Sequence, residues 1–430
     1  MVVSKRIVIV GAGFAGLQAT IHLERSFRKQ DDVEVVLVSE HNYFLFTPLL
    51  PQVVSSYLDP RHIVQPVRDI RGNRKFRFIR DPVAAIDVER REVKLASGPL
   101  RYDYLVLALG SRSEFFGIPG AAQFAAQLKS LEDAVVLRER ILDLCEHADH
   151  TTDPVERKRL LTFVVVGGGY TGVELIGEVH DFLFSYVARR YRGIAVADIR
   201  LILLEAAPEI LGGVHPSLAR HAQRRLQRQG VEIRTGARVT RLTAGAVEIA
   251  GSEIIPAETV VWTAGVRAHR LVEALPGPHD RAGRAVVNEH LQLEGHPEVF
   301  VAGDSSAAVS AMAAPRVAPV AMEHGRIAAH NIAALERGAP LDSYKYVSQG
   351  TLIALGMNYA VVDLFGVKFR GYLAWLFWNA VHLFKLVGFK KQLQVGIDWM
   401  LGSLFPRDAA MIRPARGCRL CEKSRGSSAS

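Results

Sequence analysis

The sequence predicts an α/β protein with two Rossmann-like domains and a C-terminal amphipathic segment. One pattern occurs twice along the chain: an apolar strand, a Gly-x-Gly-x-x-Gly turn, a helix, and a second strand that ends in an acidic residue. This pattern is typical of a βαβ unit in a parallel sheet. A stretch rich in apolar, aromatic and basic residues, from about 368 to 405, predicts the C-terminal segment. The length of 430 residues agrees with two to three domains.

The first copy begins with residues 6–10, an apolar run of the kind that forms a buried parallel strand. A helix is expected from about 13 to 28, and a second strand at 33–38. The turn between strand and helix reads Gly-Ala-Gly-Phe-Ala-Gly. Its three glycines would permit a tight turn, close approach of a pyrophosphate, and close helix–strand packing. We therefore expect a dinucleotide to contact Gly11, Gly13, Phe14, Ala15, Gly16 and the ribose-binding acid Glu40.

The second copy has its strands at 163–166 and 201–204, with a helix near 171–187 between them. The expected nucleotide contacts are Gly167, Gly169, Tyr170, Thr171, Gly172 and the acid Glu205. No Arg or Lys occurs at 206–208 to bind a 2′-phosphate, so the sequence favours NADH over NADPH. Two dinucleotide sites in one chain imply that one dinucleotide reduces the other.

A later strand at 299–304 ends in Gly303-Asp304, and this ending indicates which site holds a flavin. FAD is longer than NAD, and its ribityl chain needs a partner outside the first βαβ unit. The sequence resembles flavoproteins with two dinucleotide domains, in which such a Gly-Asp pair supplies that partner. The resemblance assigns FAD to the first site and Asp304 to FAD. Gly110 and Gly265, which end similar strands, are the further expected nucleotide contacts.

These assignments give a discontinuous FAD domain with an inserted NADH domain. The expected boundaries are 1–116 and 282–345 for the FAD domain, 117–281 for the NADH domain, 346–405 for a membrane-associating region, and 406–430 for a flexible tail.

Charge and cysteine content restrict the partners. The chain has 53 Lys and Arg against 44 Asp and Glu, a formal charge of +9 that favours an anionic partner. The basic residues are dispersed, without the aromatic and basic face of a nucleic-acid-binding protein, so we expect no nucleic acid as a partner.

The three cysteines exclude a disulfide framework and fit a reducing compartment. Cys418 and Cys421 lack further metal ligands, and we expect no metal.

Several segments closely resemble those of type II NADH dehydrogenases, the single-subunit NADH:quinone oxidoreductases. They read NYFLFTPLLP at 42–51, GGGYTGVELIGE at 167–178, TVVWTAGVR at 259–267 and GVKFRGYLAWLFW at 366–378. The resemblance extends over about residues 5–405. It implies transfer of a hydride from NADH to FAD, then of two electrons to a membrane quinone, without proton pumping. It also implies a peripheral location on the cytoplasmic side of the cell membrane.

The resemblance also implies roles for residues outside the two turns. Thr47 occupies the place where related disulfide reductases carry a cysteine pair, and residues 41–55 contain no cysteine. Glu174 either favours a helix N-terminus or lies beside the flavin, where it would place the nicotinamide or deliver a proton. Ala321 lies at the start of a helix expected after Pro319, and the N-terminus of this helix would face the flavin pyrimidine. The family usually has a Gln-rich pattern next, whereas this sequence has Glu323-His324, which can exchange protons with a quinol. Lys368 lies where related enzymes carry a lysine near the acceptor cavity.

The segment from Gly371 to Gly388 is apolar but contains Asn379, His382 and Lys385, which argues against an uninterrupted transmembrane span. Helical spacing separates an apolar face from a face that carries these polar residues. Such a helix fits the interface plane of an anionic membrane. A homodimer interface or a core helix is the alternative.

Two other functions remain open at this point. One is a soluble NADH-dependent flavin reductase of another acceptor, and the other is a non-enzymatic flavin redox sensor.

Overall fold

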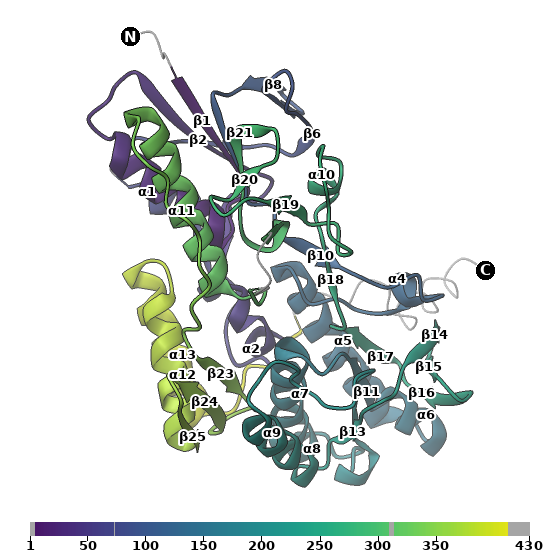
Figure 1. Cartoon of the computed structure of the whole chain (residues 1–430). Helices are drawn as coiled ribbons and strands as arrows, with labels where there is room; N and C mark the ends of the chain where they lie inside the picture. Colours follow the sequence, from purple (N-terminus) through teal and green to yellow (C-terminus); the bar gives the residue numbers. More distant parts are fainter. Residues whose placement is uncertain (1–4, 73, 309–313, 412–430) are drawn as a thin grey trace, which may run out of the picture. The chain divides into compact units, whose positions relative to one another are not determined.

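The computed structural model describes residues 5–72, 74–308 and 314–411 (Figure 1). These residues form two compact units. The first unit takes its described residues from 1–45, 64–112 and 266–349, and the second from 46–63, 113–265 and 350–430.

The first unit contains an eight-stranded sheet in the order β22-β19-β20-β21-β9-β1-β2-β5. The strands are β1 (Lys5–Val10), β2 (Val33–Ser39), β5 (Arg77–Arg80), β9 (Tyr104–Leu107), β19 (Ala285–Val287), β20 (Gln292–Leu293), β21 (His296–Val301) and β22 (Ser306–Ala308). β1 pairs in parallel with β2 and β9, and β9 pairs in parallel with β21. Their Val, Ile and Leu side chains are nearly all buried, as expected for parallel strands covered on both faces.

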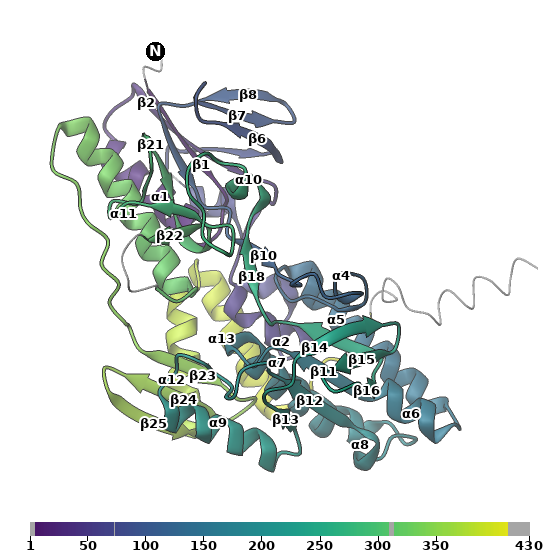
Figure 2. The same ribbon diagram turned by 45° about the vertical axis from the view of Figure 1, so that its right-hand side comes forward.

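Two long helices of the first unit, α1 (Phe14–Phe27) and α11 (Ala318–Arg337), lie side by side on one face of this sheet (Figure 2). The antiparallel strands β6 (Val83–Asp87), β7 (Glu92–Leu95) and β8 (Gly98–Arg101) lie on the other face. A Cβ at Gly325 would lie 2.1 Å from the carbonyl oxygen of Ala15, so glycine is required where α11 crosses α1. The smaller elements are β3 (Tyr43–Leu45), β4 (Val64–Pro66), α3 (Val67–Arg71), β18 (Val266–Ala268), α10 (Arg270–Glu273) and the 3-10 turn η5 (Gly303–Ser305); β10 (Ser111–Ser113) ends at the start of the second unit.

The second unit contains a parallel sheet in the order β13-β12-β11-β17. The strands are β11 (Thr162–Val166), β12 (Arg200–Leu204), β13 (Glu232–Arg234) and β17 (Thr259–Trp262). Its main helices are α5 (Leu131–His150), α7 (Tyr170–Phe182) and α9 (Pro216–Arg228), and a separate antiparallel sheet consists of β14 (Val239–Thr243), β15 (Ala246–Ile249) and β16 (Glu253–Pro256). The shorter elements are η1 (Thr47–Leu49), α2 (Leu50–Val54), η2 (Pro60–Ile63), α4 (Ala121–Phe124), α6 (Pro154–Leu160), α8 (Ala188–Arg190) and η4 (Val196–Asp198).

The C-terminal part of the second unit has an antiparallel sheet of β23 (Thr351–Ala354), β24 (Ala360–Leu364) and β25 (Val367–Gly371), followed by α12 (Tyr372–Lys385) and α13 (Phe389–Leu404). α12 has the two predicted faces. Trp375 and Asn379 are buried, whereas Leu373 and Phe384 are exposed. The apolar face is therefore the outer one. Within the described ranges, no helix is long and apolar enough to cross a membrane.

The sequence predicted the α/β fold and the order of the elements in both βαβ units correctly. One difference concerns the second helix, which we expected to run to about 187. Regular α-helix ends at Phe182 and continues as a π-helical turn, Leu183–Val187. Another concerns the segment after 405: Arg407 is buried, and its guanidinium donates a hydrogen bond of 2.9 Å to the carbonyl of Ser55. Cys418 and Cys421 lie outside the described residues.

Candidate functional site

The first glycine-rich turn lies at the carboxyl edge of the first unit's sheet. Gly11 follows β1 with φ of +106°, and a Cβ there would lie 2.3 Å from the carbonyl oxygen of Ala108. A Cβ at Gly16 would lie 1.8 Å from the carbonyl oxygen of Gly11. Gly13, by contrast, has open space around its missing side chain, and no side chain caps α1. An open glycine at an uncapped helix N-terminus fits an approaching pyrophosphate.

Three other elements of the first unit meet this turn. Gly303 has φ of +70°, and a Cβ there would lie 3.4 Å from the Ala15 side chain and 3.3 Å from that of Ala321. Asp304 accepts a hydrogen bond of 2.7 Å from the Ser111 hydroxyl. The carbonyl of Gly110 accepts one of 3.1 Å from Ser305. The first unit thus brings Ala15, Gly110, Asp304 and Ala321 together, as the extended shape of FAD requires.

Two further predicted contacts lie in the first unit. Phe14, in the first turn of α1, packs edge-on against Phe44 with ring centroids 5.1 Å apart. Glu40 is exposed just beyond the carboxyl end of β2, next to the strand that carries Gly11. Both positions agree with contact to a nucleotide along this edge.

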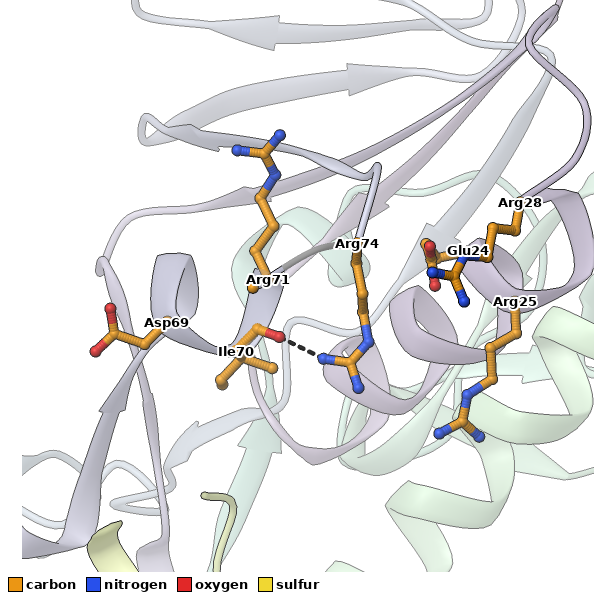
Figure 3. Close-up of a pocket in the computed structure, with 8 residues that line it drawn as sticks. Glu24, Arg25, Arg28, Asp69, Ile70, Arg71 and Arg74 are labelled. Carbon is orange, nitrogen blue, oxygen red and sulfur yellow. Dashed lines mark hydrogen bonds between the residues drawn. The ribbon is translucent and has the colours of Figure 1, made fainter. Parts of the chain in front are cut away.

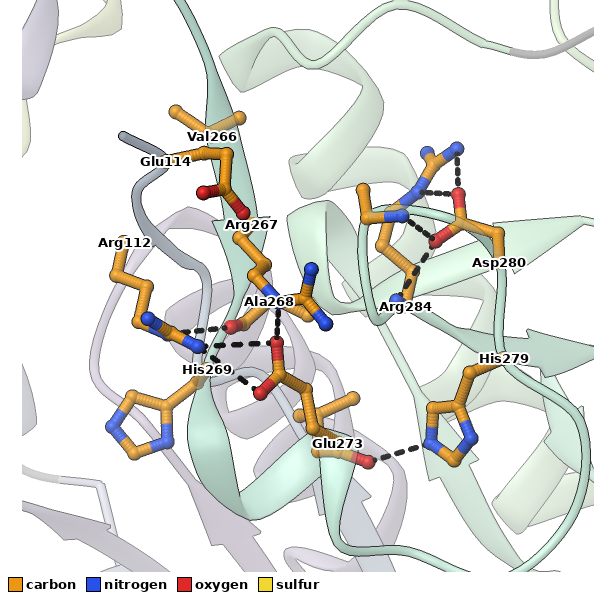
Figure 4. Close-up of polar contacts among 12 residues, drawn as sticks. Arg112, Glu114, Val266, Arg267, Ala268, His269, Glu273, His279, Asp280 and Arg284 are labelled. Atoms are coloured by element: carbon orange, nitrogen blue, oxygen red, sulfur yellow. Dashed lines mark hydrogen bonds and ion pairs between the residues drawn. The ribbon is translucent and has the colours of Figure 1, made fainter. Parts of the chain in front are cut away.

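An ion cluster fixes the segment that follows Gly110 (Figure 4). The Arg112 guanidinium donates to the carbonyl of Ala268 and, at 3.1 and 3.2 Å, to both carboxylate oxygens of Glu273. Arg267 pairs with the same carboxylate. Two guanidinium groups on one carboxylate hold this loop more firmly than a single exposed pair would.

Glu323 and His324 are neighbours on α11 but lie in different surroundings. Glu323 is half-buried, and its carboxylate accepts hydrogen bonds from Nε and Nη2 of Arg326, which lower its pKa. His324 is buried, and its Nδ1 accepts a 3.2 Å hydrogen bond from the backbone N–H of Gly303. Burial lowers the pKa of His324 to about 4, so the ring is neutral at pH 7. Its position therefore favours holding the Gly303 turn in place.

The second glycine-rich turn repeats the geometry of the first within the second unit. Gly167 has φ of +109°, and a Cβ at Gly172 would lie 1.9 Å from the Gly167 carbonyl oxygen. Gly169 has open space, and no side chain caps α7, which begins with Tyr170 and Thr171. Gly265 lies beyond the carboxyl end of β17, at the same edge of the sheet.

Glu205, which follows β12, lies at this edge but is bound to its own loop. Its carboxylate accepts hydrogen bonds of 2.7 Å from the backbone N–H groups of Gly168 and Ala207. Each carboxylate oxygen has a further lone pair, so ribose hydroxyls can still bind it.

Glu174 lies on the second turn of α7 and is half-buried. Its carboxyl accepts a 3.1 Å hydrogen bond from the backbone N–H of Ala354 on β23. Burial raises its pKa to about 8, against the opposing effects of that amide and of the Trp378 indole. At pH 7 this side chain is therefore mostly a neutral acid that can donate a proton.

The sequence did not predict that Glu178, the next carboxylate on α7, has a buried partner in Arg407. Glu178 accepts a 2.7 Å hydrogen bond from the Ser55 hydroxyl and lies 3.6 Å from the Arg407 guanidinium, which stacks over Tyr57. Burial raises the pKa of Glu178, opposed by Arg407 and Ser55. No sequence spacing relates 55, 178 and 407, so only the fold could reveal this group.

Two other predicted site residues, Lys368 and Thr47, are exposed. Lys368 is exposed on β25, 3.9 Å from Asp363, and β24 separates its strand from the β23 strand that contacts Glu174. Thr47 is exposed at the start of η1. Among the described residues, no group of three or more His, Cys, Asp or Glu side chains could hold a metal ion.

Comparison with known proteins places this geometry in a family. Residues 5–325 match the family described as pyridine nucleotide-disulphide oxidoreductase, and residues 348–408 match the NDH2 C-terminal domain. The type II NADH:quinone oxidoreductase Ndh of Mycobacterium tuberculosis is 35% identical over 94% of this chain and 89% of its own length. NdhA of the same organism is 36% identical over 92% of this chain and 86% of its own length. The chain belongs to the type II NADH:quinone oxidoreductases.

A solved structure shows the same fold. NDH2 from Plasmodium falciparum in complex with NADH has a TM-score of 0.86 at 19% identity, over 95% of this chain and all of that one. As a member of the type II family, the protein is an FAD-dependent NADH dehydrogenase that uses a quinone as acceptor. The open glycine turns, one in each unit, fit FAD and NADH as dinucleotides. The segment 41–55 contains no cysteine, so a dithiol cannot act there as in disulfide reductases.

Proposed function

We propose that this type II enzyme reduces a membrane-dissolved quinone while it is docked on the cytoplasmic face of the cell membrane, without pumping protons. FAD, when bound, supplies the two-electron chemistry that links NADH to the quinone. The observation that carries the docking proposal is the exposed apolar surface of α12 and α13. The low cysteine content supports a reducing compartment.

This apolar surface is extensive. On α12, Leu373 is 74% exposed and Phe384 82% exposed; on α13, Phe389 is 79% exposed and Leu404 72% exposed. Lys385 and Lys390 are exposed beside them. A large exposed apolar patch marks an interaction site, and one flanked by lysines fits an anionic membrane surface. A second copy of the chain could cover the same patch, and the test below separates the two.

The residues have distinct proposed roles. In the first unit Gly11, Gly13, Phe14, Ala15, Gly16, Glu40, Gly110, Asp304 and Ala321 would hold FAD. In the second unit Gly167, Gly169, Tyr170, Thr171, Gly172, Glu205 and Gly265 would hold NADH. The contact between Thr47 and the flavin stays a prediction.

The acid–base residues differ in what their surroundings allow. Glu174 retains its proton at pH 7 and would orient the nicotinamide or donate the proton that quinone reduction consumes. We propose Glu323 and Lys368 as quinone contacts, since both reach solvent. His324 would act as a positioning residue through its bond to Gly303.

The test replaces Leu373 and Phe384 by Glu in the FAD-loaded enzyme. We expect loss of binding to liposomes and a fall of about tenfold or more in NADH oxidation with a long-chain quinone held in the bilayer. NADH oxidation with a water-soluble quinone analogue should not change. The matched control is Val155→Glu, because Val155 is 75% exposed on α6, outside the apolar surface. If the parent enzyme ignores liposomes and the double variant only splits a dimer, the surface is a dimer interface.

A further inference from the structure

Helix α9 presents a row of arginines to solvent. Arg220, Arg224 and Arg228 recur every four residues, so they lie on one face of the helix, and all three are exposed. Leu218, Ala222 and Leu226 form the opposite, buried face. The helix contains no Asp or Glu.

Strand β25 adds a fourth arginine to this row. Phe369 packs against Phe377 of α12, with ring centroids 5.7 Å apart, so its neighbour Arg370 points to the other face of the sheet. α9 lies on that other face, where the Arg225 guanidinium stacks 4.9 Å from the ring centroid of Tyr359. The pKa of His221 is lowered, first by burial and then by the charges of Arg370 and the three α9 arginines. We call Arg220, Arg224, Arg228 and Arg370 the α9 basic surface.

None of these four arginines has a carboxylate within ion-pair distance among the described residues. Two other arginines of the same unit are paired with carboxylates: Arg200 lies 2.5 Å from Glu232, and Arg234 lies 2.6 Å from Glu253. Like charges held close together oppose folding unless counterions neutralise them. An external anion bound to the α9 basic surface would therefore relieve this repulsion.

The surroundings of the surface indicate which anion. Exposed apolar side chains adjoin β25: Phe365 is 80% exposed, Val367 66% and Leu373 74%. The first unit offers a contrast, a hollow of about 610 Å³ that is lined by Ile70 and by Arg25, Arg28, Arg71 and Arg74 (Figure 3). Two acids, Glu24 and Asp69, line that hollow as well, and no large exposed apolar side chain does. Basic residues beside exposed apolar ones are the combination that an anionic bilayer binds.

We propose that the α9 basic surface binds the headgroups of anionic phospholipids, so that the second unit docks with α9 and the β25 edge against the bilayer. The inference rests on the proposed membrane docking. It adds a headgroup contact in the nucleotide-binding part of the unit, and thereby fixes the orientation of that unit on the membrane.

The test is co-sedimentation of the FAD-loaded full chain with vesicles of phosphatidylcholine, with or without about a third phosphatidylglycerol. We expect the parent protein to prefer the anionic vesicles. The triple variant Arg220→Glu, Arg224→Glu, Arg228→Glu should bind them about 100-fold more weakly, at a salt concentration near physiological. Binding to neutral vesicles should change little. The matched control is Arg25→Glu, Arg28→Glu, Arg71→Glu, which changes the net charge equally and should retain anionic-vesicle binding.

The other outcomes overturn the inference in distinguishable ways. Equal loss in both triple variants would mean that net charge, not α9, is responsible. Normal vesicle binding by the α9 variant with a raised KM for NADH would mean that the surface attracts the nucleotide. A parent protein that ignores all vesicles would refute the docking proposal itself. Flavin absorbance and NADH oxidation with a soluble acceptor report whether each variant is folded.

Discussion

The two glycine-rich turns are nearly identical in their backbone but differ in the helix that follows. The Cβ positions of Gly16 and Gly172 lie 1.8 and 1.9 Å from the carbonyl oxygens of Gly11 and Gly167. After the turn, the buried side chains of α1 are apolar as far as Thr20, whose hydroxyl bonds back to Gly16. α7 instead carries Glu174 and Glu178, two carboxyls with raised pKa values.

This difference separates nucleotide binding from chemistry. The glycines admit a dinucleotide and exclude a side chain, and they do so equally in both units. The first two turns of α1 then serve packing. The second provides an acid, Glu174, that burial keeps protonated, next to one that Arg407 holds as an ion pair. The motif alone therefore predicts that a nucleotide binds, whereas we propose that the residues one turn later determine the chemistry.

The largest effect should come from a Gly→Ala substitution that blocks one glycine-rich turn at a time. Gly16→Ala places a methyl group against the Gly11 carbonyl, so we expect protein without flavin and without activity. Gly172→Ala creates the same clash in the other unit. That variant should keep its flavin but lose at least about 100-fold in the rate at which NADH bleaches it. Flavin absorbance and stopped-flow bleaching measure both.

Dithionite provides the control for Gly172→Ala, because it should still bleach the flavin if the first unit is intact. Gly396→Ala, in the interior of α13, controls for the substitution itself, since a Cβ there meets only Leu383 at 4.0 Å. If Gly172→Ala lost flavin and Gly16→Ala kept it, the assignment of the two nucleotides would be reversed.

Much of this arrangement could be predicted from sequence, because it depends on local rules. A buried strand followed by glycines and a helix places residues 11–16 at one sheet edge and 167–172 at another. The positions of Glu40 and Glu205 follow from where the second strand of each βαβ unit ends. The place of Gly303 beside Ala15 was also predictable, because the resemblance puts a later strand end next to the first glycine-rich turn.

Contacts between distant segments could not be predicted. Arg407 was expected in a loose tail, and nothing in its neighbours indicates a buried partner on α7. His324 was expected to exchange protons, but its ring is turned toward the Gly303 amide and Tyr344, 4.2 Å away between centroids. Which side of a helix meets which strand depends on packing across the whole unit, and no spacing along the chain encodes it.

The next largest effect concerns the acid that only α7 carries. Glu174→Gln removes the proposed proton donor but keeps the shape of the side chain, so we expect kcat to fall about 100-fold with little change in flavin content. In the parent enzyme kcat should decline as pH rises through about 8, because the protonated form is lost. The variant should lack this decline. A variant with parent kcat and the same pH profile would remove Glu174 from the mechanism.

The same substitution should also alter stability, with a definite sign. The pKa of Glu174 is raised from 4.5 to about 8, so the folded state holds a proton that the unfolded state releases between those values. Ionisation of Glu174 therefore lowers the free energy of unfolding as pH rises across this window, and Glu174→Gln removes this contribution. Near pH 8 the variant should melt a few degrees higher, about 1–2 kcal/mol more stable once partial solvent access is considered. Thermal melts at pH 5 and pH 8 measure the difference.

The smallest effect should separate the acids that end the two βαβ units. Glu205 binds both its own loop and, as proposed, the NADH ribose, whereas no hydrogen bond to the carboxylate of Glu40 is found among the described residues. Glu205→Ala should raise the KM for NADH about tenfold, because a charged hydrogen bond is lost. It should also reduce the preference of the enzyme for NADH over NADPH. Glu205→Gln can still accept a hydrogen bond from one loop amide. It should therefore raise the KM for NADH less than Glu205→Ala does, but it should not recover the preference for NADH over NADPH.

Glu40→Ala should leave the KM for NADH unchanged and weaken only the retention of flavin during dialysis. If Glu40→Ala raised the KM as much as Glu205→Ala, the two edges would not be serving different nucleotides.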